Sequence, residues 1–538
     1  MVNLITSVNV STEWDLEGQV HRENPYGEIE VVAILEAADG TQTTLPLFWS
    51  GGQVWTLRVS VAVAGEYSLR SKCSDTKDLG LNGVNAQLLV TNKHLDSNPL
   101  FHHGAVRVKQ GAGFVHADGT PFFWLGDTWW MQMSDRVSWP NDFTTLVQDR
   151  AEHGFTVVQV VLGYPGDLAT DDPRVGNEGG MPLATDRSRI NPAYFEACDR
   201  RLRTIIRAGI VPCILGSWGY HLLELGEKTM TDFWRYLVAR YASWPVVWAL
   251  AGETAMSYYL SKDPTGDTER LRSAWTRVSQ VVKHFDPYHR PLSTHPRRSS
   301  WLDLEDSTTL DFHMLQPGHM RNALGLGVSL IEDARKSFPE QPVVNAEPPY
   351  EGHMGTNGPE VQRFAFWSSL LSGAGGFTYG AAGIFQANDR DRPTGNRPDG
   401  GAYDATTWDE ALTFKGASQL GKARALLEKL PWQDFKPFPE WATTAVRWGE
   451  EAYDPPLRVY CAGVPNICRL FYIPRRYWHW DGSVLHCLEP GTRYQAQFVD
   501  PERFTTIDAG VALADSKGDW VVPTTPYLME WLLLLKRL

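Results

Sequence analysis

The chain has 538 residues, more than one hydrophobic core usually serves, so we expect about two to four domains. The net charge of −13, without a long basic run, excludes nucleic acid and an anionic membrane surface as partners. No stretch reaches the ~18 apolar residues of a membrane span, and the six cysteines lack the CxxC spacing of a zinc site. Because the N-terminus lacks a signal-peptide pattern, we expect a cytoplasmic protein with reduced thiols and no metal.

Residues 1–95 contain short runs in which apolar and polar residues alternate, such as "IEVVAILEA" and "GEYSLRSKC". Turn residues, as in "NPYG" and "ADGT", separate these runs. Alternation with period two between regular turns predicts an immunoglobulin-like antiparallel β-sandwich. The following segment, "TNKHLDSNPLFHHG", is typical of a linker.

Residues 105–432 show a different pattern, in which short apolar runs alternate with longer amphipathic stretches. This βαβα order is typical of a parallel sheet covered by helices. Eight strands can be counted, which predicts an α/β fold of the (β/α)₈ (TIM) barrel type. A doubly wound sheet is the competing fold, but it needs a glycine-rich phosphate loop, and "GLGVSL" at Gly325 lacks the third glycine. The strand candidates are 122–130, 156–164, 210–218, 246–253, 290–298, 310–318, 342–351 and 376–384.

Residues 435–538 return to short alternating runs, such as "RLFYIP", "YQAQFVDP" and "DWVVP". A polar helical stretch at 410–430 separates them from the barrel pattern. We therefore predict a second, C-terminal β-sandwich.

Polar or aromatic residues follow almost every predicted barrel strand. The active site of such a barrel lies at the carboxyl ends of its strands, so these side chains are expected to meet in one site. The chain is also rich in tryptophan, with 22 residues, and flat rings suit the faces of sugars. The predicted substrate-binding residues are Asp127, Trp129, Trp130, Tyr164, Trp218, His295, Gln316, His319, Tyr350, Glu351 and Tyr379.

Two carboxylates, Glu253 and Glu347, end the fourth and seventh predicted strands. These strands lie nearly opposite each other in an eight-stranded barrel, so the two acids are expected to face one pocket. Facing carboxylates in different environments are what glycoside hydrolysis requires. Glu351, four residues after Glu347, remains an alternative for the working acid of its strand.

Other chemistries fit the sequence less well. It contains no GxSxG nucleophile elbow, no Walker motif and no lysine at a strand end. The first predicted strand also lacks the histidines of a metal-dependent barrel hydrolase. We therefore expect no cofactor and no metal.

Three stretches, "GAGFVHADGTPFFWLGDTWW", "VVWALAGE" and "PVVNAEPPYEG", resemble the apiosidase-like glycoside hydrolases, whose best-defined branch is glycoside hydrolase family 140. The resemblance extends to the N-terminal "ENPYGE" and "GGQVWTLRVS" and implies flanking sandwiches on a clan-A-like barrel. It also implies Glu253 as acid/base and Glu347 as nucleophile. Relatives commonly have Asp at the position of Glu253, and the usual preceding Asn is replaced by Gly252, so apiose is not carried over as the substrate.

The sequence thus predicts a cytoplasmic glycoside hydrolase that cleaves a short plant-type oligosaccharide or glycoside with two carboxylates. Retention of configuration is favoured, and inversion stays open. Two alternatives remain: a non-catalytic carbohydrate-binding barrel, and an enzyme that uses the same scaffold for transglycosylation or elimination. A small carbohydrate is the expected partner, while the sugar, the linkage and the oligomeric state, including a homo-oligomer, remain open.

Overall fold

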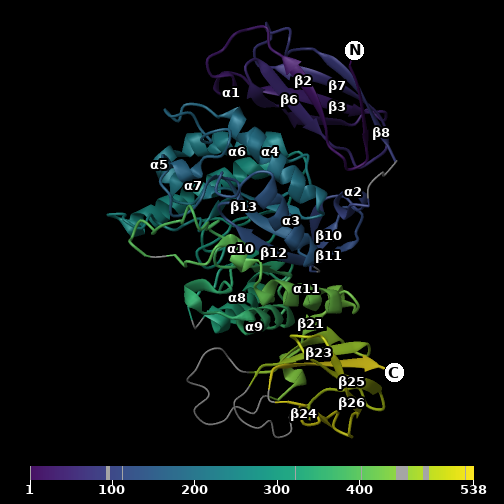
Figure 1. Cartoon of the computed structure of the whole chain (residues 1–538). Helices are drawn as coiled ribbons and strands as arrows, with labels where there is room; N and C mark the ends of the chain where they lie inside the picture. The colour runs from purple at the N-terminus through teal and green to yellow at the C-terminus, as the bar shows by residue number, and fades with distance from the viewer. Residues whose placement is uncertain are drawn as a thin grey trace.

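The computed structural model describes residues 2–92, 97–111, 113–320, 323–401, 403–443, 458–475, 484–527 and 529–538. Figure 1 shows three parts in a row: N-terminal sheets in purple at the top, a barrel in the middle and C-terminal sheets in yellow at the bottom. The predicted order of sandwich, barrel and sandwich is confirmed. Part of the predicted linker, residues 93–96, lies outside the described residues.

The N-terminal part consists of two sheets around one hydrophobic core. The larger sheet has the order β1-β8-β7-β3-β4 and the smaller one the order β2-β6-β5. The pairing is antiparallel as predicted, except that the first strand runs parallel to the last. The elements are β1 (Val2–Ser7), β2 (Thr12–Glu17), α1 (Pro25–Glu28), β3 (Val31–Ala37), β4 (Gln42–Pro46), β5 (Phe48–Gly51), β6 (Val54–Val59), β7 (Gly65–Cys73) and β8 (Asn85–Thr91).

The central part is built on a parallel sheet with the order β17-β15-β14-β13-β12-β20-β19-β18. A short additional strand, β16, pairs with β14. The longest strands are buried along their whole length, which explains why they read as continuous apolar runs. The strands are β12 (Trp124–Trp129), β13 (Val157–Tyr164), β14 (Val211–Trp218), β15 (Val247–Ala249), β16 (Ala251–Gly252), β17 (Leu292–Ser293), β18 (His313–Leu315), β19 (Val343–Asn345) and β20 (Gly376–Tyr379).

The gap between β17 and β18 is bridged by single backbone hydrogen bonds. The Asp311 N–H donates to the Leu292 carbonyl at 2.8 Å, and the Gln316 N–H donates to the Arg298 carbonyl at 2.9 Å. Leu315 also forms an isolated bridge with Ser299. These contacts nearly close the barrel, and they hold Gln316 at the carboxyl end of β18.

Helices surround the barrel as predicted. A small sheet in the order β11-β10-β9 precedes the first barrel strand. No helix of the described residues is both long enough and apolar enough to cross a membrane. The helices are α2 (Pro99–His102), α3 (Asn141–Glu152), η1 (Pro173–Val175), α4 (Pro192–Arg207), α5 (His221–Leu225), α6 (Glu227–Tyr241), α7 (Pro264–Phe285), α8 (Ala323–Ser337), η2 (His353–Gly355), α9 (Pro359–Leu371), α10 (Trp408–Ala411) and α11 (Lys415–Leu427), and the small sheet comprises β9 (Val106–Lys109), β10 (Gly113–His116) and β11 (Pro121–Phe122).

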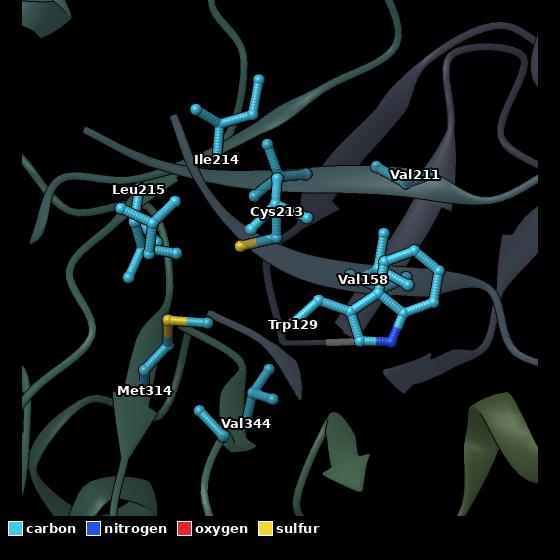
Figure 2. Close-up of a cluster of buried hydrophobic side chains, with 14 of the residues drawn as sticks. Trp129, Val158, Val211, Cys213, Ile214, Leu215, Met314 and Val344 are labelled. Atoms are coloured by element: carbon cyan, nitrogen blue, oxygen red, sulfur yellow. The ribbon is translucent and has the colours of Figure 1, made fainter. Parts of the chain in front are cut away.

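The barrel interior is a packed core. Figure 2 shows Trp129, Val158, Cys213, Met314 and Val344 in one cluster of buried hydrophobic side chains that the barrel strands contribute. All five are buried. A filled barrel of this kind leaves the strand ends as the place for a ligand.

The C-terminal part is a six-stranded antiparallel sheet, β21-β22-β23-β28-β25-β26, with a two-stranded companion, β24-β27. The "WLLLL" run forms the buried part of a central strand. This part is attached to the barrel by the Arg363 guanidinium of α9, which binds Glu530. The elements are η3 (Trp432–Asp434), β21 (Lys436–Pro437), η4 (Pro439–Trp441), β22 (Tyr460–Val464), β23 (Cys468–Ile473), β24 (Val484–Leu485), β25 (Arg493–Val499), β26 (Thr506–Leu513), β27 (Trp520–Val521) and β28 (Trp531–Arg537).

Candidate active site

Glu253 and Glu347 line one cavity of about 280 Å³ at the carboxyl ends of the barrel strands. Glu253 directly follows β16, and Glu347 comes two residues after β19. The Gln316 amide, which follows β18, joins them: its Nε2 lies 2.8 Å from Glu347 Oε1 and 3.4 Å from Glu253 Oε1. These two carboxylate oxygens can therefore be no farther apart than the sum of those distances.

Glu347 accepts two hydrogen bonds at Oε1, whereas its Oε2 has no hydrogen-bond donor among the described residues and lies beside His295. His319 Nε2 lies 2.9 Å from Oε1, beside the Gln316 amide, and His295 Nε2 lies 3.3 Å from Oε2. Burial alone raises the pKa of a carboxyl, but the contacts with the His295 and His319 side chains outweigh it and hold the pKa of Glu347 well below its ordinary value. Glu347 is therefore ionised at neutral pH.

Glu253 has the opposite environment. Its main-chain φ is 43°, in the left-handed region, and its Oε2 accepts one hydrogen bond from the Trp218 indole at 3.1 Å. Burial, together with the negative charge of Glu347, raises the pKa of Glu253 to about 7, although the Trp218 donor lowers it. A proton is thus available on Glu253 below neutral pH. Two acids with pKa values pushed apart in this way can take the roles of proton donor and nucleophile.

These environments predict how activity depends on pH. Catalysis that needs protonated Glu253 and ionised Glu347 should be lost as the pH rises through about 7, because Glu253 then gives up its proton. The acid limb should lie well below the ordinary carboxyl range, since the pKa of Glu347 is lowered. Measuring kcat/KM between about pH 4 and pH 9 tests this. A profile that is flat through neutrality would contradict the role of Glu253.

Two glycines make room for the Trp218 indole. A Cβ atom on Gly252 would lie 2.3 Å from the ring, and one on Gly166 would lie 2.8 Å from it. Gly252 pairs with Trp218 across β16 and β14. The missing asparagine before Glu253 thus has a steric reason, because the tryptophan that binds Glu253 occupies the space of that side chain.

We expect Gly252→Ala to displace the indole and break its hydrogen bond to Glu253. Overpacking of this kind costs about 1–3 kcal/mol of stability, and kcat/KM should fall by about tenfold, the worth of one hydrogen bond to a carboxyl. The checks are thermal unfolding and steady-state kinetics. Gly327→Ala is the matched control, because a Cβ there meets nothing closer than 3.5 Å. Equal behaviour of the two variants would contradict the steric account.

Five predicted binding residues line the cavity, and one lies beneath it. The five are Trp130, Trp218, Gln316, His319 and Tyr350, and Gln316 also bridges the two acids. His295 is fully buried below the wall, and its ring packs edge to face against Trp130 at 5.1 Å. It contacts Glu347 without bordering the cavity.

Asp127 and Trp129 are not cavity residues, which corrects their expected role in binding sugar. Both are fully buried on the side of the strand that faces α3, where Trp129 packs against Phe143, and Trp129 belongs to the core drawn in Figure 2. The Asp127 carboxylate accepts hydrogen bonds from Arg150 Nε at 2.6 Å and from Trp129 Nε1 at 2.8 Å. It also accepts from the Thr128 N–H at 2.8 Å. These three contacts give Asp127 a structural role, because the one with Arg150 links its strand to α3.

Glu351, Tyr379 and Tyr164 also lie outside the cavity wall. Glu351 accepts a hydrogen bond from the Tyr379 hydroxyl at 2.6 Å and others from the Gly416 N–H, at the start of α11, at 3.0 and 3.1 Å. Tyr164 is buried among other rings, with its centroid 5.7 Å from that of His221. The geometry therefore favours Glu347 over Glu351 as the working acid.

Sequence reasoning missed the parts of the wall that come from loops. They lie after β13, after β16, after β19 and in the long segment after β20, away from any strand pattern. Only Asp167, three residues beyond β13 in "YPGD", carried a usable signal, as an acid close to a strand end. The additional lining residues include Asp167, Arg174, Tyr259, His353, Met354, Phe385, Gln386, Asn396, Arg397 and Tyr403.

The wall carries buried polar atoms without protein partners. Among the described residues these include Asp167 Oδ1, Gln316 Oε1 and Gln386 Nε2. Buried polar atoms are normally paired, so a ligand that fills this cavity should both donate and accept hydrogen bonds. Among the residues that the structure describes, no group of three or more His, Cys, Asp or Glu is arranged to hold a metal ion.

Comparison with known proteins agrees with this architecture. Residues 109–434 match the family model described as "Apiosidase-like, catalytic domain". A structure provisionally described as a glycoside hydrolase from Bacteroides vulgatus is 17% identical, with a TM-score of 0.71 over 99% of this chain and 100% of that one. A glycoside hydrolase family 5 structure from the same organism is 19% identical, with a TM-score of 0.63 over 81% of this chain and 94% of that one. No curated protein sequence matches the chain.

Proposed function

The chain belongs to the apiosidase-like family, and from this membership we propose that it is a retaining glycoside hydrolase. One observation carries the proposal: the single Gln316 amide lies within reach of both carboxylates, whose environments are opposite. The sum of its two distances is below the roughly 6.5–9.5 Å between the acids of inverting enzymes and close to the ~5–5.5 Å of retaining ones. A separation in this range supports direct attack by Glu347 over attack by a water molecule that a base activates.

In the first step Glu347 attacks the anomeric carbon of the bound sugar. The bond to the leaving oxygen breaks as Glu253 gives that oxygen its proton, and a glycosyl ester forms on Glu347. In the second step Glu253, now ionised, removes a proton from water, which attacks the same carbon and releases Glu347. The product sugar keeps the configuration of the substrate.

The size of the cavity supports a ligand of which only a small glycosyl unit is enclosed. Its volume of about 280 Å³ lies at the lower end of ligand pockets, which span ~300–1,000 Å³. Its wall combines rings with polar groups that can meet hydroxyls. We propose a short plant-type oligosaccharide or glycoside as the substrate.

The decisive experiment is product analysis on a panel of 4-nitrophenyl glycosides and short oligosaccharides. Release of a free sugar by the wild type, and its loss in the Glu253→Gln/Glu347→Gln double variant, is the expected result. Transfer of the sugar to another sugar in place of water would indicate a transglycosylase. Binding without any product would indicate a carbohydrate-binding barrel and would overturn the proposal.

Trp130 is expected to serve as a wall for the sugar. Its ring packs edge to face with Trp218 at 5.3 Å and is almost entirely buried beside the cavity. Trp130→Ala should raise KM by about tenfold with a smaller effect on kcat, because ring contacts are worth about 1 kcal/mol beyond burial. Trp301→Ala, in a partly buried ring outside the cavity, is the control. Unfolding of the Trp130 variant without any change in KM of the folded fraction would indicate a core role instead.

A further inference from the structure

A third carboxylate, that of Asp167, borders the same cavity as Glu253 and Glu347. It comes from the loop after β13, and the two-acid mechanism does not use it. Its Oδ1 atom is buried and has no hydrogen-bond partner among the residues that the structure describes. A buried carboxylate oxygen without a donor is costly, so the position favours a ligand that supplies one.

The backbone fixes the direction of this side chain. Asp167 has a φ of 65°, in the left-handed region that Asp and Asn tolerate better than most residues. Its N–H donates to the Tyr220 hydroxyl oxygen at 2.8 Å. Gly166, just before it, lies against the Trp218 ring. The loop is therefore held between two aromatic side chains, and the carboxylate is oriented before any ligand arrives.

Its neighbours in the wall are Tyr259 and Arg397. Burial raises the pKa of Asp167, while the Tyr259 hydroxyl and the charge of Arg397 lower it in part. The Arg397 guanidinium sits 5.8 Å from the Tyr259 ring centroid and is bound to Asp399 at 3.0 and 3.2 Å. The positive charge of Arg397 is thus already paired with the Asp399 carboxylate of the same loop.

The charges of this wall favour a neutral ligand. The other arginine of the wall, Arg174, is paired with Asp172 at 2.5 Å. Within the described part of the wall, both guanidinium groups therefore already have carboxylate partners, and three acids face the cavity. An anionic sugar would meet these acids without a free cation to bind it, whereas a hydroxyl can donate to Asp167.

We propose that Asp167 is a specificity-determining residue that accepts a hydrogen bond from one hydroxyl of a neutral glycosyl unit, with Tyr259 beside it. The inference rests on the proposed glycoside hydrolase function. Asp167 lines the same cavity as Glu253 and Glu347, so a glycosyl unit bound between the two acids lies within its reach. It touches the substrate and takes no part in bond breaking.

The test combines Asp167→Asn with a series of monodeoxy 4-nitrophenyl glycosides of the sugar that the wild type cleaves best. Asparagine keeps the left-handed backbone and removes the charge, and Asp167→Gly keeps the backbone and removes the side chain. On the parent glycoside, kcat/KM should fall by about 10- to 100-fold, the worth of a hydrogen bond to a charged group. Asp171→Asn, in the same loop but exposed, is the matched control and should match the wild type.

The expected result is that the wild type and the Asp167 variants cleave one of the deoxy glycosides equally well. For the other deoxy glycosides, the difference in kcat/KM between wild type and variants should be as large as on the parent glycoside. Equal losses at every position, or no loss on the parent glycoside, would overturn the inference. Faster cleavage of the corresponding uronide than of the neutral sugar would also overturn it. If the wild type cleaves none of the glycosides, the proposed hydrolase function is wrong, and calorimetry with the same glycosides then tests the role of Asp167. Binding that is lost in Asp167→Gly supports that role, and the absence of binding to the wild type refutes it.

Discussion

Glu347→Ala should abolish turnover of every glycoside, whatever its leaving group, because the group that attacks the anomeric carbon is gone. The loss in kcat should be on the order of 10⁵-fold or more, comparable to the removal of nucleophiles in other hydrolases. The fold should survive, since the two side chains that donate to Glu347, Gln316 and His319, border a cavity that water can enter. The measurement is kcat on a reactive and on an unreactive aryl glycoside, with circular dichroism to verify folding.

Glu351→Ala is the matched comparison on the same strand end. It should retain turnover and lose stability instead, because its carboxylate holds the Tyr379 hydroxyl and the start of α11 together. Removal of one partner from a buried hydrogen bond costs about 1–3 kcal/mol. An inactive Glu351→Ala beside a Glu347→Ala of near-normal activity would mean that the two acids have been assigned in the wrong order.

Glu253→Ala should produce a loss that depends on the leaving group. General acid catalysis contributes about 10²- to 10⁴-fold, so glycosides with poor leaving groups should lose that much in kcat/KM. Activated aryl glycosides need little protonation and should keep their first step, after which the glycosyl ester on Glu347 accumulates. Kinetics across aryl glycosides of graded leaving-group pKa measure this difference.

Azide gives an independent check on the same variant. It is a nucleophile that needs no base, so it should attack the accumulated ester, restore turnover and yield a glycosyl azide of retained configuration. It should not accelerate the wild type, and any rescue of Glu347→Ala should yield a glycosyl azide of inverted configuration, because azide then takes the place of the missing nucleophile. A uniform loss across all leaving groups, or no rescue by azide, would show that Glu253 is not the acid/base.

The sequence was sufficient to predict the fold and the location of the two acids. Buried parallel strands read as short apolar runs separated by amphipathic stretches, and both patterns depend on local composition. Glu253 and Glu347 were placed by their positions after strands four and seven, and the structure brings both to one cavity. The resemblance of "VVWALAGE" and "PVVNAEPPYEG" to known enzymes pointed to the same residues.

The direction in which the other strand-end side chains point could not be predicted in the same way. Asp127 and Trp129 precede Trp130 by only a few positions, yet they contact Arg150 and Phe143 of the outer helix α3, whereas Trp130 borders the cavity. Alternation along a strand gives two faces but does not say where the packed core stops and the cavity starts. Glu351 follows Glu347 by four residues, and contact with α11, about 65 residues further along the chain, decides where it points.

That the loop residues meet in one wall was beyond sequence reasoning for a related reason. Asp167 and Arg397 are far apart in the chain and meet only because two long loops fold over the same strand ends. Neither loop has a periodic pattern from which its course can be inferred. The role of Gly252 likewise depends on a tryptophan from another strand, which only the paired structure reveals.

The most direct test of the central claim is to trap the glycosyl ester. A 2-deoxy-2-fluoro glycoside of the cleaved sugar, with a good leaving group, slows both steps but leaves the first one faster, so the ester should accumulate. Peptide mass spectrometry after digestion should then find one added glycosyl group, carried by Glu347. A label on Glu351 or Glu253, or hydrolysis with inversion and no label at all, would contradict the account.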